Sequence, residues 1–315
     1  MTAWHKQGLV FDTARQGVGG WMRHSALTPT PWRLDDDTIR VYAGFRDEDG
    51  VSRIGYVDVL ADDPSRVLRV SAEPALDIGR GGCFDDNGMI LGDIVDGPGG
   101  LHLFYVGFQR VARAKFLAFT GLAISTDGGE HFERVQETPI LDRAPGRSTI
   151  GAVHSAMYDG GQWRLWYAVG DDWERIDGQP FPRYHIRSVA TDDLSAIPLD
   201  AHVCLRPRGN EYRIGRPRVY RENGRYTMYF TRGNVTGEYF PGMAFSDDGI
   251  AWERRDEALG LALSDAGWDS RTICYPALLP RGDDMLMFYN GNDMGMDGFG
   301  LAVAKRPRFE SGTHV

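Results

Sequence analysis

The chain has 315 residues, of which 42% are hydrophobic and 11% aromatic, so it is long enough to bury a large core. Its formal net charge of −9, without a basic cluster, argues against a nucleic-acid partner. No apolar stretch approaches the length of a membrane span, and residues 1–8 lack the basic and apolar regions of a signal peptide. Three widely spaced cysteines argue against a disulfide framework and for a reducing compartment. We therefore expect a cytoplasmic protein with no membrane partner.

One pattern recurs five times along the chain. A short apolar run is followed by a polar turn of a few residues and then by an aromatic strand that ends near Tyr-x-Gly. A repeat of this length, built from short β segments, predicts a propeller. Five copies would place the starts of five inner strands around a narrow central funnel. The copies span residues 28–44, 89–107, 153–169, 216–230 and 275–291.

The second half of each copy predicts two further strands. A loop and a third strand precede a turn that carries Asp-Gly or paired acidic residues, and Asp-Gly between β segments is a hairpin signal. The 40 glycines and 16 prolines suit a fold with many such turns. Each blade is therefore expected to have four strands. The clearest second halves are 121–132 and 243–252, and weaker ones are 54–58, 188–193 and 300–304.

The last copy ends soon after its third strand, at residues 305–308, and needs a strand from elsewhere. The segment 8–12 precedes the first copy and is not otherwise used. We expect it to pair with the last blade, which closes the ring and removes an exposed sheet edge. The sequence thus predicts an all-β, five-bladed propeller of four-stranded blades, a single domain over residues 1–315.

Acidic side chains recur where the inner strands enter the funnel. The second blade offers Asp85 and Asp86, the fourth Glu211 and the fifth Asp269. A protonated carboxyl beside an ionised one can act as general acid and as base or nucleophile, the pairing that cleaves glycosidic bonds. The alternative is that these acids only cap turns.

The predicted ligand-binding residues are arginines, histidines and aromatic or amide residues near the same end of the blades. An arginine there holds a carboxylate ionised, binds an anionic substrate group, or forms a surface ion pair. Rings and amides recognise sugars, and the long loop 170–183 is expected to form the rim that sets specificity. His154 replaces the proline of its repeat and is either a core histidine or a funnel residue. The full set is His24, Arg46, Arg80, His154, Trp173, Arg213, Arg216, Arg271, Tyr275 and Asn290.

Cofactor motifs give no signal. No cysteine or histidine spacing matches a zinc site, and the glycine-rich segment 79–82 lacks the strand-to-helix context of a phosphate loop. We expect no cofactor and no metal, and nothing in the sequence supports a structural or axial cation.

The Ser-x-Asp turns at 125–132 and 246–252, with the Arg-Pro and Tyr-Pro inner strands, make the whole chain resemble the five-bladed propeller glycosidases. That group includes arabinanases, xylosidases, fructosidases and mannoside phosphorylases. The resemblance implies three acids on the inner strands of the first three blades. This sequence departs from that pattern, because the first blade offers His24 instead of an aspartate and the third offers no glutamate. Asp85 and Asp86 match the base or helper position, and Glu211 is the substitute acid.

The resulting hypothesis is a divergent enzyme that acts on a glycosidic bond of a small saccharide or glycoconjugate. Asp86 or Asp85 would be base or nucleophile, Glu211 the general acid, and Asp269 an orienting carboxylate. One alternative is a cytoplasmic transferase or phosphorylase of saccharide biosynthesis, whose arginines hold a phosphate or nucleotide. A second alternative is a non-catalytic sugar-binding propeller. The sequence does not indicate the oligomeric state.

Overall fold

The structure is a computed structural model that describes residues 3–16 and 19–306. Twenty strands dominate it, and the described helices are three short 3-10 turns (η1 Gly20–Met22, η2 Asp256–Ala258, η3 Asn292–Met294). In the described part of the chain, no helix has the length and apolar character needed to cross a membrane. The strands are β1 His5–Phe11, β2 His24–Arg33, β3 Thr38–Arg46, β4 Ser52–Leu60, β5 Val67–Val70, β6 Met89–Gly97, β7 Gly100–Val111, β8 Ala114–Ser125, β9 Glu133–Arg134, β10 Ile150–Asp159, β11 Gln162–Ile176, β12 Gln179–Thr191, β13 His202–Leu205, β14 Glu211–Glu222, β15 Arg225–Asn234, β16 Tyr239–Ser246, β17 Glu253–Arg254, β18 Cys274–Arg281, β19 Asp284–Asn290 and β20 Phe299–Lys305.

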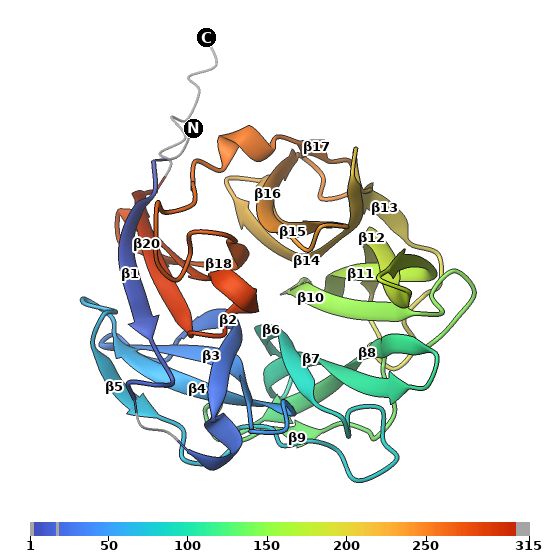
Figure 1. Cartoon of the computed structure of the whole chain (residues 1–315), viewed down its shortest axis with the longest axis horizontal. Coiled ribbons are helices and arrows are strands. Elements are labelled where there is room, and N and C mark those ends of the chain that lie inside the picture. The colour runs from blue at the N-terminus through green and yellow to red at the C-terminus, as the bar shows by residue number, and fades with distance from the viewer. Residues whose placement is uncertain (1–2, 17–18, 307–315) are drawn as a thin grey trace.

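Consecutive strands pair in antiparallel runs that surround a common centre (Figure 1). One sheet has the order β2-β3-β4-β5 and another has β1-β20-β19-β18. The third sheet contains three such runs, β6 to β9, β10 to β13 and β14 to β17. Short parallel contacts, β8 with β10 and β12 with β14, join these runs. The chain is therefore all-β with curled sheets, as the sequence predicts.

The Ser-x-Asp turns that carry the sequence resemblance have a local hydrogen-bonding cause. Ser125 donates to Asp127 Oδ1 over 2.7 Å, and the same oxygen accepts the backbone N–H of Glu130 at 3.0 Å. Ser246 and Asp248 repeat this arrangement after β16, with Ser246 donating over 2.9 Å. Because these side chains satisfy the backbone of a tight turn, they end one strand and start the next.

The inner strands β2, β6, β10, β14 and β18 all depart from regular pairing near the same depth. The register shifts between Leu91 and Asp93 in β6 and between Val153 and Ser155 in β10, and comparable shifts occur in the other three strands. Such a bulge turns a side chain out of the regular alternation. The residues at or beside the five bulges are Thr28, Gly92, His154, Arg216 and Tyr275, and all five line one small chamber.

Strand β1, which contains most of the segment 8–12, pairs antiparallel with β20. Its last residue, Phe11, is fully buried. The Phe11 ring packs 5.8 Å from Phe45 of β3 and 5.8 Å from Phe299 of β20, measured between ring centroids. A single side chain of β1 thus connects the first antiparallel run to the last.

We predict that Phe11→Ala lowers the free energy of unfolding by about 3–5 kcal/mol, because it leaves a cavity between two runs. The matched control is Gln7→Ala on the exposed face of the same strand, which should leave stability near wild type. Urea denaturation of both variants measures the difference. Equal stability of the two variants would show that β1 contributes little to the fold.

Candidate functional site

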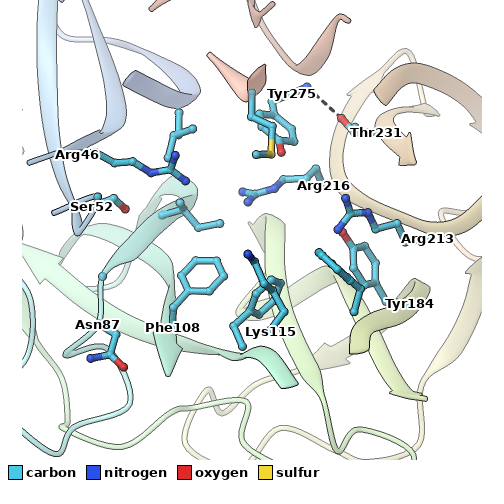
Figure 2. A pocket seen from close by; sticks show the side chains of 18 of the residues that line it. Arg46, Ser52, Asn87, Phe108, Lys115, Tyr184, Arg213, Arg216, Thr231 and Tyr275 are labelled. Atoms are coloured by element: carbon cyan, nitrogen blue, oxygen red, sulfur yellow. Dashed lines mark hydrogen bonds between the residues drawn. The ribbon is translucent and has the colours of Figure 1, made fainter. Parts of the chain in front are cut away.

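A pocket of about 340 Å³ lies at the centre of the molecule. Its walls come from all five antiparallel runs, through β2, β3, β4, β6, β7, β8, β12, β14, β15, β16 and β18. We call it the axial pocket, and Figure 2 shows its side chains. A concave site that so many elements build is the place where a ligand of this fold would be enclosed.

Five cationic residues line the axial pocket: Arg46, Arg110, Lys115, Arg213 and Arg216. Among the described residues that line it, none is an aspartate or glutamate. In Figure 2 the side chains of Arg46, Arg216 and Lys115 point toward the middle of the pocket from different strands. The pocket therefore carries concentrated positive charge in a chain of formal net charge −9.

Aromatic rings contact three of these cations, Lys115, Arg213 and Arg216. The Arg216 guanidinium lies 4.7 Å from the centroid of the Tyr275 ring, and Lys115 Nζ lies 5.8 Å from that of Phe181. Arg213 stacks on Tyr239 at 4.6 Å. Such contacts favour a cation without neutralising it. The rings also provide the apolar faces on which a sugar ring packs.

The bulges of β14 and β18 aim Arg216 and Tyr275 at the axis. Both residues have positive φ, 56° and 58° respectively. Each such conformation costs about 1–3 kcal/mol and persists where the surrounding structure enforces it, as it does at many ligand sites. Here the backbone N–H of Tyr275 donates to Thr231 Oγ1 over 3.0 Å, which fixes the bulge of β18 to β15 (Figure 2).

Below the axial pocket, the five bulge residues surround the small chamber, which shares Arg216 and Tyr275 with it. His154 lines this chamber, and its Nδ1 atom is buried without a hydrogen-bond partner. Burial, together with the charges of Arg216 and Arg218, lowers the pKa of His154 well below its usual range. The imidazole is therefore neutral at pH 7, and His154 is a residue of the funnel floor.

The segment 170–183, expected to be a loop, is a hairpin of β11 and β12. Residues 172–176 pair with residues 179–183. The turn consists of Asp177 and Gly178, both with positive φ, as the tight hairpin turn requires. Phe181 and Tyr184 of β12 line the axial pocket, whereas Trp173 packs against a hydrophobic cluster that includes Leu91 and Tyr105.

The structure does not bring the four predicted catalytic acids together in the axial pocket. Asp85 is buried and forms an ion pair with Arg134, in which Nε donates over 2.9 Å and Nη2 lies 2.7 Å from the carboxylate. Asp269 is also buried, with Lys6 Nζ at 2.6 Å and the Tyr289 hydroxyl at 2.9 Å. Both carboxylates thus hold parts of the scaffold together, Asp269 by joining β1 to the last run.

The other two acids, Glu211 and Asp86, also accept hydrogen bonds from neighbouring groups. Glu211 receives two hydrogen bonds from Arg254, at 2.9 and 2.6 Å, and one from the backbone N–H of Arg208 at 2.8 Å. Burial alone would raise the pKa of Glu211, but the hydrogen bonds from Arg254 and Arg208 and the charges of Arg254 and Arg232 together outweigh it, and the pKa is lowered. A carboxylate ionised at pH 7 is a poor general acid. Asp86, half-buried, accepts the backbone N–H of Gly82 within its own loop at 2.7 Å.

Of the ten predicted ligand-binding residues, Arg46, Arg213, Arg216 and Tyr275 line the axial pocket and His154 the chamber below it. Besides Trp173, four others lie elsewhere. The exposed Arg80 and Arg271 pair with Glu137 and Asp293, respectively. His24 contacts the adjacent Ser25 hydroxyl at 2.9 Å. Asn290 is buried and bonds the backbone of Thr28 and Ala26, which ties β19 to β2.

The chain is 33% identical over 307 residues to the uncharacterised protein Rv1502 of Mycobacterium tuberculosis strain H37Rv, with 96% of this chain and 99% of that protein covered. Its identity to the uncharacterised protein MT1551 of strain CDC 1551 is also 33% over the same length. The chain belongs to the Rv1502 family. No protein-family model matches it.

Solved structures similar to this member of the Rv1502 family are glycoside hydrolase-like propellers. One named "Glycoside hydrolase" has a TM-score of 0.72 at 15% identity and covers 99% of this chain and 94% of its own. A thermostable family-43 glycoside hydrolase has a TM-score of 0.68 at 15% identity, and the match covers 94% of this chain and 93% of that one. A glycosyl hydrolase from Bacteroides ovatus has a TM-score of 0.64 at 14% identity, and the match covers 96% of this chain and 90% of that one. At these identities the likeness establishes the fold, and it confirms the resemblance predicted from the sequence.

Several pocket residues of this Rv1502-family chain were not predicted. Phe108 and Lys115 belong to the β7–β8 hairpin, and Phe181 and Tyr184 to the β11–β12 hairpin. The Asp-Gly pair at 177–178 was an available signal, because it marks a hairpin whose long strands reach the rim. Nothing equivalent marks Lys115. Across the described residues, no group of three or more histidine, cysteine or acidic side chains is placed to hold a metal ion.

We predict that Glu211→Ala lowers the free energy of unfolding by about 1.5–3 kcal/mol, because it removes two charge-assisted hydrogen bonds and leaves Arg254 with Asp256 as its carboxylate partner. Glu137→Ala, which removes the exposed partner of Arg80, is the control and should leave stability near wild type. Chemical denaturation at pH 7 measures both. Wild-type stability of Glu211→Ala together with abolished turnover would instead support the catalytic role predicted from sequence.

Proposed function

We propose that this chain is a carbohydrate-active enzyme that binds a saccharide in the axial pocket and cleaves or transfers a glycosidic bond there. We further propose that its antiparallel runs are the five blades of one propeller domain, closed by β1. The single observation that carries the functional proposal is the axial pocket itself, enclosed at the centre of a fold shared with glycoside hydrolases.

The chemistry of the walls supports a saccharide ligand. Tyr184, Tyr239 and Tyr275 offer ring faces, and the side chains of Asn87 and Gln109 offer amide donors and acceptors. Sugars are bound by this combination, in which apolar ring faces stack and hydroxyl groups pair with amides. A volume of about 340 Å³ is also within the range of small-molecule sites.

Glycosyl transfer or phosphorolysis is the second candidate, and one observation favours it. The lining residues include five cations and, among those described, no carboxylate, whereas hydrolysis by a carboxylate pair needs two acids flanking the bond. The roles predicted for Asp85, Asp86, Glu211 and Asp269 remain proposals on which hydrolysis depends. The cytoplasmic location also remains a prediction, supported by three buried free cysteines.

The proposal predicts turnover of a glycoside that depends on the aromatic wall. A panel of nitrophenyl glycosides and oligosaccharides, assayed with and without inorganic phosphate, identifies the substrate. Tyr184→Ala should then raise KM about tenfold, since losing an aromatic contact costs roughly 0.5–1.5 kcal/mol beyond its area. Tyr158→Ala is the control, because this exposed tyrosine lies outside the pocket.

Each result separates the three candidate functions. Turnover without phosphate supports hydrolysis, and turnover only with phosphate supports phosphorolysis. Saccharide binding without turnover supports a binding protein. Absence of both binding and turnover across the panel, or an equal KM in Tyr184→Ala, would contradict the axial pocket as a saccharide site.

A further inference from the structure

The cations of the axial pocket lack carboxylate partners, unlike the buried Arg40 and Arg218. Within the described residues, no ion pair involves Arg46, Arg213 or Arg216. The Nε atom of Arg213 is also buried without a hydrogen-bond partner. Arg216 makes only a long contact, 3.5 Å, to the carbonyl of Leu91. Figure 2 shows these guanidinium groups around one space.

Elsewhere several buried guanidinium groups pair with a carboxylate, whereas the buried Arg147 donates to the backbone carbonyl of Asp142. Arg40 lies 2.8 Å from Asp58, and Arg254 lies 2.6 Å from Glu211. The sharpest contrast is within β14, where Arg218 pairs with the buried Asp93 while Arg216, two residues earlier, has no acid. Acidic residues outnumber basic ones in this chain, 44 to 35, so a shortage of carboxylates does not explain the difference.

Leaving these cations unpaired has a cost. Burial lowers the pKa of Arg46 and of Arg216, which reports that the charged form is less well solvated there than in water. Arginine nevertheless stays protonated, so the charge remains and must be compensated by something outside the chain. A site with several uncompensated cations is therefore built for a negatively charged group.

The guanidinium groups are also held in fixed positions. Arg213 lies against the rings of Tyr212 and Tyr239, 4.7 and 4.6 Å from their centroids, and Arg216 lies on Tyr275. Stacked guanidinium groups keep their N–H donors in a defined plane, which suits the paired oxygens of phosphate or carboxylate. Lys115 of β8 adds a further point charge to the pocket.

We propose that the axial pocket recognises an oxyanion, a phosphate or carboxylate, held between Arg46, Arg213 and Arg216 while the sugar that carries it packs on the aromatic wall. This inference rests on the proposed function for its saccharide part. The same donors would also hold free inorganic phosphate, and the experiment below distinguishes the two sources.

The test is calorimetric titration of the whole chain at constant ionic strength, set with sodium chloride. The probes are inorganic phosphate, glucose 1-phosphate with glucose as its neutral counterpart, and methyl glucuronide with methyl glucoside. We expect at least one charged sugar to bind at least tenfold more tightly than its neutral counterpart. A charged sugar that binds more tightly than inorganic phosphate assigns the oxyanion to the saccharide, and equal affinity assigns the site to free phosphate.

Variants connect the binding to the pocket. Arg46→Gln and Arg216→Gln should each weaken the charged probe by about tenfold to a hundredfold, the worth of one or two charge-assisted hydrogen bonds. Arg80→Gln, which removes an exposed arginine outside the pocket, should not change it. If Arg216→Gln unfolds, Arg46→Gln, at the end of β3, still gives the answer.

Failure of this inference differs from failure of the proposed function. Neutral sugars that bind as tightly as charged ones, with no loss in either variant, would overturn oxyanion recognition and leave the saccharide site standing. Oxyanion binding that both variants weaken, without glycosidic turnover on any substrate, would support oxyanion recognition and overturn the enzyme. Absence of binding by every charged probe would overturn the inference outright.

Discussion

The ion pair between Arg218 of β14 and Asp93 of β6 joins two inner strands that do not hydrogen-bond to each other in a sheet. Asp93 also accepts the backbone N–H of Ala156 in β10 at 2.9 Å, and Arg218 donates to Thr30 of β2. One buried cluster therefore links four of the five inner strands to one another. Breaking such a pair leaves an uncompensated buried charge, so the cluster constrains the whole centre of the molecule. Asp93 is thereby paired with Arg218, whereas Arg216, two residues earlier on β14, has no carboxylate partner among the described residues.

The bulges convert this scaffold into a site. A shift of register in each inner strand turns a side chain toward the axis, and its repetition around the molecule supplies the floor of the pocket. Gly92 shows how tightly the geometry is set, since a Cβ atom there would lie 2.3 Å from the carbonyl oxygen of Val153. At the corresponding positions of β14 and β18 the chain places Arg216 and Tyr275, and their stacking gives the pocket its charge and its apolar face.

The strands and part of the pocket were predictable from the sequence because both depend on local patterns. The repeated inner-strand pattern located β2, β6, β10, β14 and β18, and with them Arg216 and Tyr275. The surroundings of the acids were not predictable, because their partners are distant in sequence: Arg134 for Asp85, Arg254 for Glu211 and Lys6 for Asp269. An acid at the mouth of a funnel and an acid in a structural ion pair look the same until the chain is folded.

The central claim is that the unpaired guanidinium groups on the axis hold a tetrahedral or planar oxyanion. The most direct measurement is a crystal structure of the protein grown with tungstate, a phosphate-like oxyanion whose metal gives an anomalous signal. The account predicts an anomalous peak between Arg46, Arg213 and Arg216, with oxygens within hydrogen-bond distance of at least two of these side chains. Tungstate bound only at exposed arginines such as Arg80 or Arg271, with an axial pocket free of it, would contradict the claim.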